Sequence, residues 1–578
     1  MKKFYSHPFQ RWALAMLICC PSLLLAQDEA ALAPVSRAYA LTNATIVQAP
    51  GRKMEAATIV IKNGLIHAVG KGISIPSDAI IIKADSLFIY AGFIDGLSRA
   101  GVNKPKDDPS KERPKDPGNP TPERAGITPQ YDVRPFLNLA DKSLEEMRGI
   151  GFTAAHVVPY GGMLPGNGSI ILLGGSSADA MIVSNKNSFY SELTPAERGA
   201  YPTTVMGVMA KYRELYRQAT LTKNYQTLYA SNRTGLERPS SDRILESFYP
   251  VIDKRQTVFF KAEKVLELQR VLSLQKELGF TLTLVEVKEG WDMIPKVKAS
   301  NARVFLSLDL PEEKKDEKKT EEKKVDEKKT DDKKVDVKKE DKPKTVSELE
   351  KETLEKRRTD FVSKYVGQAS TYQKAGVRFG FSSLSAKSKD IPANLRRIIK
   401  AGLSEDDALA SLTIIPAEIF GLSDRLGTID NGKIANLVIS DKPYFNEKAK
   451  VRYVFVEGVL YKQEIVEEKK PDAKMEIEGT WSVTTEIPQG KSETSLVIKK
   501  DGTSYSARIS GGQLPQPVDA TSVVLEGNVL KIAYSVTING QIMDVKMEVT
   551  MDGNTFKGNT SVTSFGSFPV EGKKEPKF

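Results

Sequence analysis

The middle of this 578-residue chain alternates between short apolar runs and longer amphipathic stretches, and this alternation constrains the fold most. The apolar runs have the length and the Val, Ile and Phe content of buried strands, whereas the stretches between them have helical spacing. Strands that alternate with helices indicate βα units and a parallel sheet. We therefore predict an α/β fold in which residues 91–424 form a TIM-like (β/α)8 barrel. The predicted strands are GFTAAHVVP, QTVFFKAE, FTLTLVEV, ARVFLSLDLP and VRFGFSSL. The predicted helices are DKSLEEMRGI, KAEKVLELQRVLSLQKELG, SELEKETLEKRRTDFVSKYVGQASTYQKAG and SEDDALASLTIIPAEIFGL.

Strand-rich segments precede and follow the alternating region. Asn63-Gly64 lies between the apolar runs TIVIK and LIHAVG, and Asn-Gly between two such runs is a strong hairpin signal. Similar short strands, separated by glycine and asparagine turns, return downstream of the barrel. We predict that residues 27–90 and 425–466 pair with each other as one composite β-sandwich.

The N-terminus has the features of an export signal. The cationic stretch MKKFYSHPFQR is followed by the apolar run WALAMLICCPSLLLA, which is short for a membrane span and ends with the small residue Ala26. Both cysteines, Cys19 and Cys20, lie in this leader, so the mature chain has no disulfide and no thiolate metal site. We predict a signal peptide over residues 1–26, a periplasmic or secreted location, and no membrane span in the mature chain.

Two further segments differ in composition from the barrel. Residues 312–344 repeat a pentad of acidic residues and lysines with Thr or Val, a pattern that leaves no apolar helix face and predicts a disordered, low-complexity insert. Residues 475–578 contain alternating strands joined by Asp-Gly and Asn-Gly turns, which predicts a C-terminal all-β barrel or sandwich. The GTW motif at its start, Gly479–Trp481, resembles the opening strand of lipocalin-like barrels.

The composition argues against a nucleic-acid partner. The formal net charge is +10, but lysines of the leader and of the low-complexity insert contribute to it. We find no basic helix and no interleaving of aromatic and basic residues of the kind that contacts nucleic acid. We therefore expect no nucleic-acid binding.

Several stretches in order along the chain resemble the amidohydrolase superfamily, in particular its imidazolonepropionase-like and dihydroorotase-like metal-dependent hydrolases. They are ALTNATIV, ATIVIKNGLIHAVGKGISIP, YAGFID, GFTAAHVVPYGGMLPGNGSIILL, AGLSEDDALASLTIIPAEIFGLSDRLGTIDNGKIANLVI and VRYVFVEGVLYK. The resemblance implies a barrel with a composite flanking domain, hydrolysis of carbon–nitrogen bonds, and zinc or another divalent metal that activates water. It implies ligands at two paired histidines, a bridging Lys or Glu, two later histidines and an Asp after the last strand.

The histidines that such a site needs are missing. His7 lies in the leader, and His67 and His156 are the only others. When the chain is compared with the family pattern, Leu97 and Arg99 occupy the positions of the paired histidines. Lys261 or Glu263 occupies the position of the next histidine, and Glu286 occupies that of the last one. Leu384 occupies the position of the catalytic Asp. Because a tight metal site needs imidazole, thiolate or carboxylate ligands, we predict a degenerate site with no metal and no other cofactor.

The residues that replace the ligands form a candidate site of their own. Arg99, Lys261, Glu263 and Glu286 are expected near the C-terminal mouth of the barrel, and His156 also ends a predicted strand. Two interpretations stay open: a buried ion-pair network that neutralises itself, or a pocket that holds a small anionic or peptide-like ligand through Arg99 and Lys261. The glycine-rich stretch PYGGMLPGNGS is predicted to be a βα turn.

Two function classes follow from this pattern. The first is an exported, catalytically degenerate amidohydrolase homologue, a pseudoenzyme that acts as a binding or partner subunit through an intact amidohydrolase paralogue or through self-association. The second is a hydrolase of carbon–nitrogen bonds, in non-peptide or cyclic amides, with a rearranged site. The resemblance alone favours an enzyme, whereas the missing ligands favour an inactive or atypical one.

Overall fold

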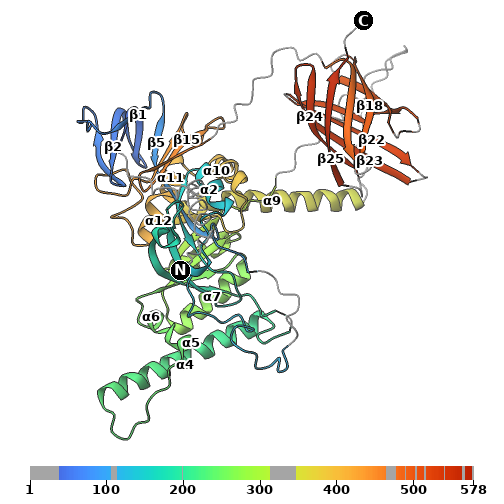
Figure 1. Ribbon diagram of the computed structural model, residues 1–578. Helices are drawn as coiled ribbons and strands as arrows, with labels where there is room; N and C mark the ends of the chain where they lie inside the picture. Colours follow the sequence, from blue (N-terminus) through green and yellow to red (C-terminus); the bar gives the residue numbers. More distant parts are fainter. Residues whose placement is uncertain are drawn as a thin grey trace, which may run out of the picture. The chain divides into compact units, whose positions relative to one another are not determined.

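The chain forms two compact units, Met1–Ile465 and Val466–Phe578. The computed structural model describes residues 38–105, 114–312 apart from 198, 346–463, and 477–575 with short gaps (Figure 1). The predicted signal peptide and the low-complexity insert after Glu312 lie outside the described residues. Among the residues that are described, no helix is long and apolar enough to cross a membrane.

The first unit begins with a sheet that combines strands from both flanks of the barrel. Its order is β16-β15-β14-β5-β1-β2-β3, and β4 also pairs with β1. The two flanks meet where β5 pairs antiparallel with β14, so that Ala91 faces Leu437. The predicted hairpin at Asn63-Gly64 is confirmed: both residues have positive φ, as a two-residue turn between β2 and β3 requires. The strands are β1 (Tyr39–Ala49), β2 (Arg52–Lys62), β3 (Leu65–Gly70), β4 (Ile80–Lys83), β5 (Phe88–Ala91), β14 (Leu437–Ser440), β15 (Val451–Val456) and β16 (Val459–Lys462).

The barrel is a sheet of eight strands in the order β13-β12-β11-β10-β9-β8-β7-β6. Its two ends approach each other where the Ser383 amide donates to the Leu97 carbonyl at 3.1 Å, so the barrel is nearly closed. The strands are β6 (Phe93–Ser98), β7 (Phe152–Val157), β8 (Gly166–Leu172), β9 (Ile182–Glu192), β10 (Thr257–Lys261), β11 (Leu282–Val287), β12 (Arg303–Ser307) and β13 (Phe379–Ser382).

One strand departs from the predicted parallel barrel. β8 pairs antiparallel with both β7 and β9, so the glycine-rich stretch before it joins two antiparallel strands. The prediction that this stretch is a βα turn was therefore wrong. Glycine is needed in β8 because a Cβ at Gly168 would lie 2.4 Å from His156 Nε2. The remaining neighbouring pairs of the barrel, from β9 to β13 and from β6 to β7, are parallel.

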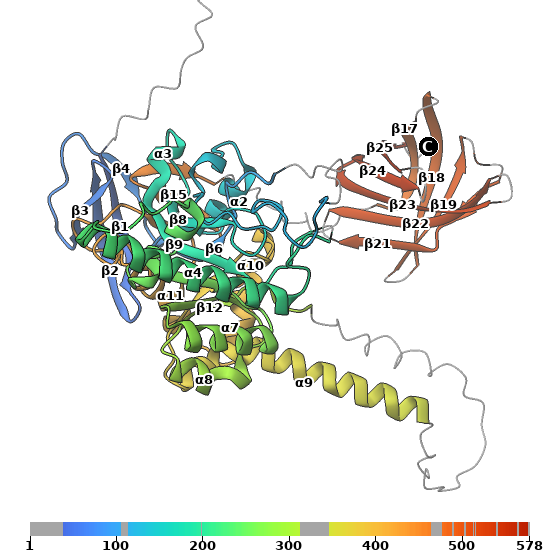
Figure 2. The ribbon, with the colours of Figure 1, turned by 90° about the horizontal axis from the view of Figure 1, so that it is seen from below.

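Helices cover the outside of the barrel, and Figure 2 shows α4, α7 and α8 on one side of it. The long helix α4 begins after Thr204, whose side chain caps it. The stretch expected as one helix before the last sandwich strands is split into α11 and α12 at Thr413. The helices are α2 (Lys142–Gly149), α3 (Ala178–Met181), α4 (Val205–Ser231), α5 (Arg243–Glu246), α6 (Tyr249–Ile252), α7 (Val265–Leu278), α8 (Ile294–Ala299), α9 (Val346–Lys374), α10 (Ile391–Lys400), α11 (Glu405–Leu412) and α12 (Ile414–Ile419).

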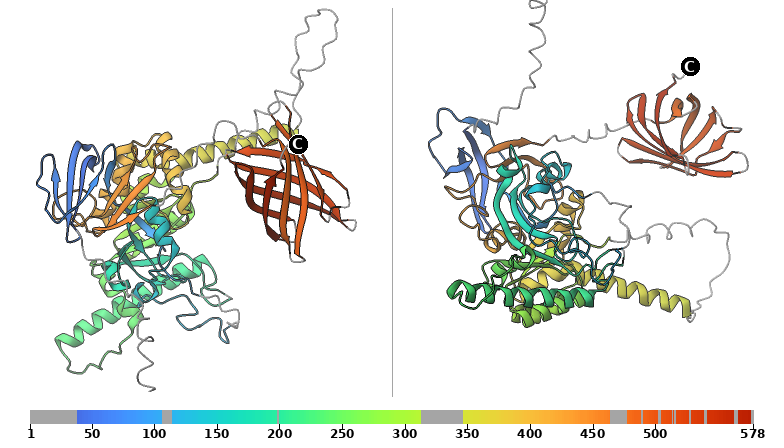
Figure 3. Two further views of the ribbon diagram at one scale, coloured as in Figure 1. Left: turned by 45° about the horizontal axis from the view of Figure 1, so that its top comes forward. Right: turned by 60° about the horizontal axis from the view of Figure 1, so that its bottom comes forward.

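The second unit is a single antiparallel sheet in the order β20-β19-β18-β17-β25-β24-β23-β22-β21. Only two residues separate β20 from β21, although these strands stand at opposite ends of the order, so the sheet curves around its core (Figure 3). Trp481 and Phe556 fill that core, and a Cβ at Gly572 would lie 2.1 Å from the Phe556 ring. The strands are β17 (Gly479–Ile487), β18 (Gly490–Asp501), β19 (Ser504–Gly511), β20 (Val518–Asp519), β21 (Ser522–Glu526), β22 (Val529–Ile538), β23 (Gln541–Asp552), β24 (Thr555–Val562) and β25 (Gly566–Lys574).

Candidate functional site

The candidate site lies where the parallel barrel strands end. Arg99 directly follows β6, Glu192 is the last residue of β9, and Lys261 is the last residue of β10. Lys261 and Glu192 are register partners on neighbouring strands. Because the carboxyl ends of parallel strands share one rim of a barrel, these side chains meet at its mouth.

The first part of the rim is built around Glu192. Arg99 Nη2 lies 2.9 Å from Glu192 Oε1, and the Tyr190 hydroxyl donates to the same oxygen at 2.9 Å. The Thr194 hydroxyl donates to the other oxygen at 2.9 Å. The Arg99 guanidinium also lies over the Tyr160 ring, 4.4 Å from its centroid. Arg99 is therefore held on two sides, by a carboxylate and by an aromatic face.

The second part of the rim is built around Glu263. Its two oxygens lie 2.9 Å from Lys261 Nζ and 3.4 Å from Lys288 Nζ, and Lys288 also reaches Asp309 at 2.9 Å. Burial would lower the pKa of Lys261, but the Glu192 and Glu263 carboxylates outweigh it and raise that pKa. Burial would likewise raise the pKa of Glu263, but Lys261 and Lys288 lower it. These groups therefore stay ionised near neutral pH.

The rim cluster, as we call it, consists of Arg99, Glu192, Lys261, Glu263, Lys288 and Asp309. It contains three cations and three carboxylates, so its charges balance. Its side chains are between 7% and 43% exposed, which leaves most of the cluster in partial contact with solvent.

Below the rim, Glu286 is fully buried and has no ion-pair partner within salt-bridge distance among the residues described. The hydroxyls of Ser307 and Ser382 donate to its two carboxyl oxygens, each at 2.6 Å. Glu286 has φ +60°, and the pairing of β11 with β12 shifts register between Leu284 and Val287. This irregularity turns the Glu286 side chain towards the serines. Burial raises the pKa of Glu286.

Asp95, in β6, is the second fully buried acid of the barrel interior. Its Oδ1 accepts hydrogen bonds from the amides of Leu97 at 3.2 Å and of Ser383 at 3.0 Å, and the Ser383 hydroxyl donates to Oδ2. Burial raises the pKa of Asp95 to about 7, against the lowering effect of these hydrogen bonds. We refer to Asp95 and Glu286 as the interior acids.

Two of the expected ligand positions hold apolar side chains inside the barrel. Leu97 is fully buried in a cluster with Tyr190, Phe259 and Phe305, and Leu384 packs against the same cluster. A Cβ added at Gly96 or at Gly380 would lie 2.0 Å or 2.4 Å from the Phe305 ring, so this ring fills the space between β6 and β13. The interior of the barrel is therefore packed rather than open.

The two histidines that the structure describes lie elsewhere. His156 is fully buried, with Nε2 2.7 Å from the Ser188 hydroxyl and Nδ1 3.1 Å from the Gly96 carbonyl. Its ring packs against both Phe259 and Phe420, and burial lowers its pKa to about 4. His156 therefore forms part of the packed interior and makes no contact with the rim cluster. His67 is exposed on β3 of the flanking sheet.

The residues at these positions do not fit the divalent metal that the resemblance implies. Leu97 and Leu384 have no donor atom, and Arg99 is a cation. Both oxygens of Glu286 already accept serine hydroxyls. No group of three or more His, Cys, Asp or Glu is arranged to hold a metal ion in the part of the chain that the structure describes. Divalent metals bind where several such ligands converge.

The structure rearranges the contacts that the sequence predicts. Lys261 and Glu263 do pair, but Arg99 pairs with Glu192, and Glu286 pairs with serines rather than with Arg99 or Lys261. Sequence reasoning assigned no role to Glu192, Asp95, Lys288, Asp309 and the serines of β12 and β13. A carboxylate at the end of a short run that contains aromatic residues, SFYSEL, was the signal that could have identified Glu192, but this run was not among the predicted strands.

Comparison with known proteins agrees with this architecture. The Amidohydrolase family model matches residues 312–461, which include the end of the barrel and the last strands of the flanking sheet. An amidohydrolase from Thermotoga maritima MSB8 superposes with a TM-score of 0.57 at 21% identity, covering 74% of this chain and all of that one. This chain has the amidohydrolase fold. A putative prolidase from Bifidobacterium longum is 15% identical, with a TM-score of 0.42 and coverage of 74% and 96%. No curated protein matches the sequence.

Proposed function

We propose that this chain is an exported protein with the amidohydrolase fold that has lost metal-dependent hydrolysis and acts as a binding or partner subunit. The observation that carries the proposal is the use of the former ligand positions. Leu97 and Leu384 belong to the packed interior, Arg99 is bound to Glu192, and Glu286 is bound to two serines. The side chain at each of these positions makes a structural contact that would have to be broken before a metal ion could bind.

The mouth retains one feature of a ligand site. Arg99 Nε is buried and has no hydrogen-bond partner among the described residues. A carboxylate is the natural acceptor for a guanidinium donor. We propose that a small anionic or peptide-like ligand binds at the rim through Arg99 and that the charge balance of the rim cluster limits its affinity.

Metal analysis tests the loss of hydrolysis. The purified protein should retain well under one equivalent of zinc, manganese, nickel or iron after dialysis, because the former ligand positions lack a converging donor set. It should also fail to hydrolyse N-acyl amino acids and cyclic amides. Stoichiometric metal that is lost in Glu263→Gln and Glu286→Gln would contradict the proposal.

Calorimetry tests the ligand site. N-acetylglycine should bind saturably and N-acetylglycinamide, its neutral analogue, should not, because only the former carries a carboxylate. Arg99→Met should abolish the binding, whereas Asp424→Asn, a change at an exposed acid outside the rim cluster, should leave it intact. Equal binding of both compounds, or binding that survives Arg99→Met, would exclude this role for Arg99.

The proposed partner is an intact amidohydrolase paralogue or a second copy of this chain. Co-expression with a homologue encoded next to it, one that keeps all its histidines, should yield a complex in size-exclusion chromatography. A chain that elutes as a monomer, alone and with that homologue, would contradict the partner role.

One observation favours the alternative of a carbon–nitrogen hydrolase with a rearranged site. Asp95 is hydrogen-bonded to both the amide and the hydroxyl of Ser383, which directly follows β13 and precedes Leu384, the position where the resemblance implies a catalytic acid. In this alternative Asp95 would take the proton from attacking water. Hydrolysis of a cyclic amide that Asp95→Asn abolishes would establish it.

A further inference from the structure

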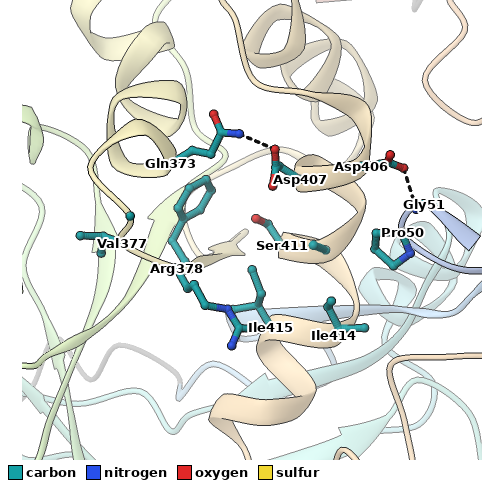
Figure 4. A pocket seen from close by; sticks show the side chains of 13 residues that line it. Pro50, Gly51, Gln373, Val377, Arg378, Asp406, Asp407, Ser411, Ile414 and Ile415 are labelled. Carbon is teal, nitrogen blue, oxygen red and sulfur yellow. Dashed lines mark hydrogen bonds between the residues drawn. The ribbon is translucent and has the colours of Figure 1, made fainter.

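A cleft of about 430 Å³ lies in the first unit at the end of the barrel opposite the mouth. Its walls come from the turn between β1 and β2, the end of α9, the residues that lead into β13, and helices α11 and α12 (Figure 4). The start of β13 borders this cleft, whereas the end of the same strand carries Ser382, which binds Glu286. The cleft is therefore separate from the candidate site, and its size is in the usual range for small-molecule pockets.

One polar side chain in the cleft is buried without a partner. Ser411, on α11, is 1% exposed, and its hydroxyl forms no hydrogen bond with any residue that the structure describes. Figure 4 shows this side chain between Asp407 and the two isoleucines of α12, with its oxygen on the cleft side. A buried hydroxyl that faces a cavity is normally satisfied by water or by a ligand.

Carboxylates supply the charge of the cleft. Asp406 accepts the Gly51 amide at 3.0 Å through Oδ1, and its Oδ2 forms no hydrogen bond with a residue that the structure describes. Asp407 accepts hydrogen bonds from Gln373 and from Ser404 through Oδ2. The C-terminal end of α9 also borders the cleft, and the carbonyl end of a helix favours a cation.

The one basic side chain of the lining is already neutralised. Arg378 forms two contacts with Glu418, from Nη1 to Oε1 at 2.9 Å and from Nη2 to Oε2 at 2.6 Å. Such a fork-to-fork pair leaves little attraction for an anion. The net charge that a ligand meets in the cleft is therefore negative.

The rest of the lining is apolar. Ile414, Ile415 and Val377 border the cleft together with Ala410 and the Phe379 ring. Ile415 and Phe379 are buried, and Ile414 and Val377 are partly exposed. A ligand that covered these side chains would remove apolar surface from water, which contributes to binding in proportion to the area covered.

We propose that this cleft binds a small amphipathic amine, with its ammonium group among Asp406, Asp407 and Ser411 and its apolar body against Ile414, Ile415 and Val377. An ammonium donates three hydrogen bonds and accepts none, which matches two carboxylates and a hydroxyl that can act as acceptor. Because the Gly51–Asp406 bond joins the flanking sheet to α11 in the same wall, the bound amine strengthens the contact between sheet and barrel.

Benzylamine is a suitable probe, with benzyl alcohol and benzoate as neutral and anionic analogues of the same shape. Calorimetry with the purified protein at neutral pH should show saturable binding of benzylamine only. Asp407→Asn should weaken it about tenfold, because a hydrogen bond to an ionised acceptor is stronger than one to a neutral acceptor. Ser411→Ala should weaken it severalfold. It should not affect folding, because no hydrogen bond to a described residue is lost.

The control variants are Asp424→Asn, an exposed acid outside the cleft, and Glu192→Gln in the rim cluster. Both should bind benzylamine like the parent protein, so the result is independent of the function proposed for the mouth. The proposal is overturned if benzylamine does not bind saturably or if either analogue binds as tightly. Unchanged affinity in both Asp407→Asn and Ser411→Ala overturns it as well.

Discussion

The interior acids and the rim cluster lie next to each other in the barrel, but their carboxyl groups are stabilised by different kinds of partner. Asp95 and Glu286 are fully buried and are held by serine hydroxyls and backbone amides, and burial raises the pKa of both. The rim carboxylates are less deeply buried, from 7% exposed for Glu192 to 43% for Asp309, and they are held by lysines and an arginine. The difference shows that depth decides the partner: an acid out of contact with water is stabilised in its neutral form, and one near water as an ion pair.

This comparison also separates structural from functional candidates. Both interior acids are fully buried, and all their carboxyl oxygens accept hydrogen bonds from serine hydroxyls or backbone amides. The rim contains the one unpaired buried donor of the site, Arg99 Nε, among the residues described. We therefore expect interior substitutions to act on stability and rim substitutions to act on binding.

The largest effect is expected where the interior is packed by a single ring. Phe305→Ala should lower the free energy of unfolding of the first unit by about 3–5 kcal/mol, because it leaves a large cavity between Gly96 and Gly380. Urea denaturation monitored by circular dichroism checks this value. Phe305→Leu, which keeps most of the volume, should cost clearly less. A cost below 1 kcal/mol for Phe305→Ala would mean that the interior is not packed around this ring.

The next effect depends on pH. Asp95 has a pKa near 7 in the folded chain and about 4 when unfolded, so between these values the folded state holds a proton that the unfolded state releases. Its contribution to stability is therefore complete below about pH 4 and is lost as the pH rises through 7. The loss between pH 4.5 and 7.5 should be on the order of 3 kcal/mol.

The pH dependence of stability from His156 has the opposite sign to that from Asp95 over part of this range. The effect of Asp95 must therefore be measured as the difference between the parent protein and a variant without this acid. Burial lowers the pKa of His156 to about 4, and stability from this group therefore rises as the pH increases towards its unfolded value. The parent protein should vary little between pH 4.5 and 6.5 from these two groups. The difference in unfolding free energy between parent and Asp95→Asn should fall with rising pH, and a flat difference would contradict the raised pKa.

Two substitutions of Glu286 should have a smaller effect on the free energy of unfolding, and they test whether this acid is neutral and hydrogen-bonded or ionised. Glu286→Ala should cost about 2–3 kcal/mol, because it removes the acceptor to which the buried hydroxyls of Ser307 and Ser382 donate. Glu286→Gln keeps the shape and an acceptor, and should cost about 1 kcal/mol or less. Chemical denaturation of both variants near pH 5 provides the test. If Gln cost as much as Ala, the carboxylate would be ionised and the comparison between interior and rim would fail.

The sequence predicts the architecture of the barrel better than it predicts the site. The alternation of strands and helices and the Asn63-Gly64 turn depend on local patterns, and both appear in the structure. The βα turn predicted for the glycine-rich stretch was wrong, because the apolar run that follows it has the same pattern in a parallel and in an antiparallel pair. The helix α4 was not predicted, although its Thr cap and the helical spacing of Val208, Tyr212, Leu215 and Ala219 were visible.

The sequence predicted where the site lies, but it did not predict which side chains contact each other there. The loss of ligands at Leu97, Arg99 and Leu384 follows from residue identity alone. That Glu192 lies beside Lys261 depends on the register of β9 against β10, and the direction of the Glu286 side chain depends on a backbone irregularity with positive φ. Neither feature has a signature in the chain, because each results from long-range packing.

The smallest effect is expected at the rim and tests whether its ion pairs act separately from the interior. Arg99 and Glu192 are in contact, with side chains 23% and 7% exposed, so a double-mutant cycle of Arg99→Met and Glu192→Gln should give a coupling energy of about 1 kcal/mol. The matched cycle of Arg99→Met with Glu286→Gln should be additive within about 0.5 kcal/mol, because no hydrogen bond or ion pair joins these residues. Salt should reduce the first coupling and leave the second unchanged, since a partly exposed pair is screened. Strong coupling between Arg99 and Glu286 would instead show that the rim and the interior form a single ionic network, and the distinction by depth would no longer hold.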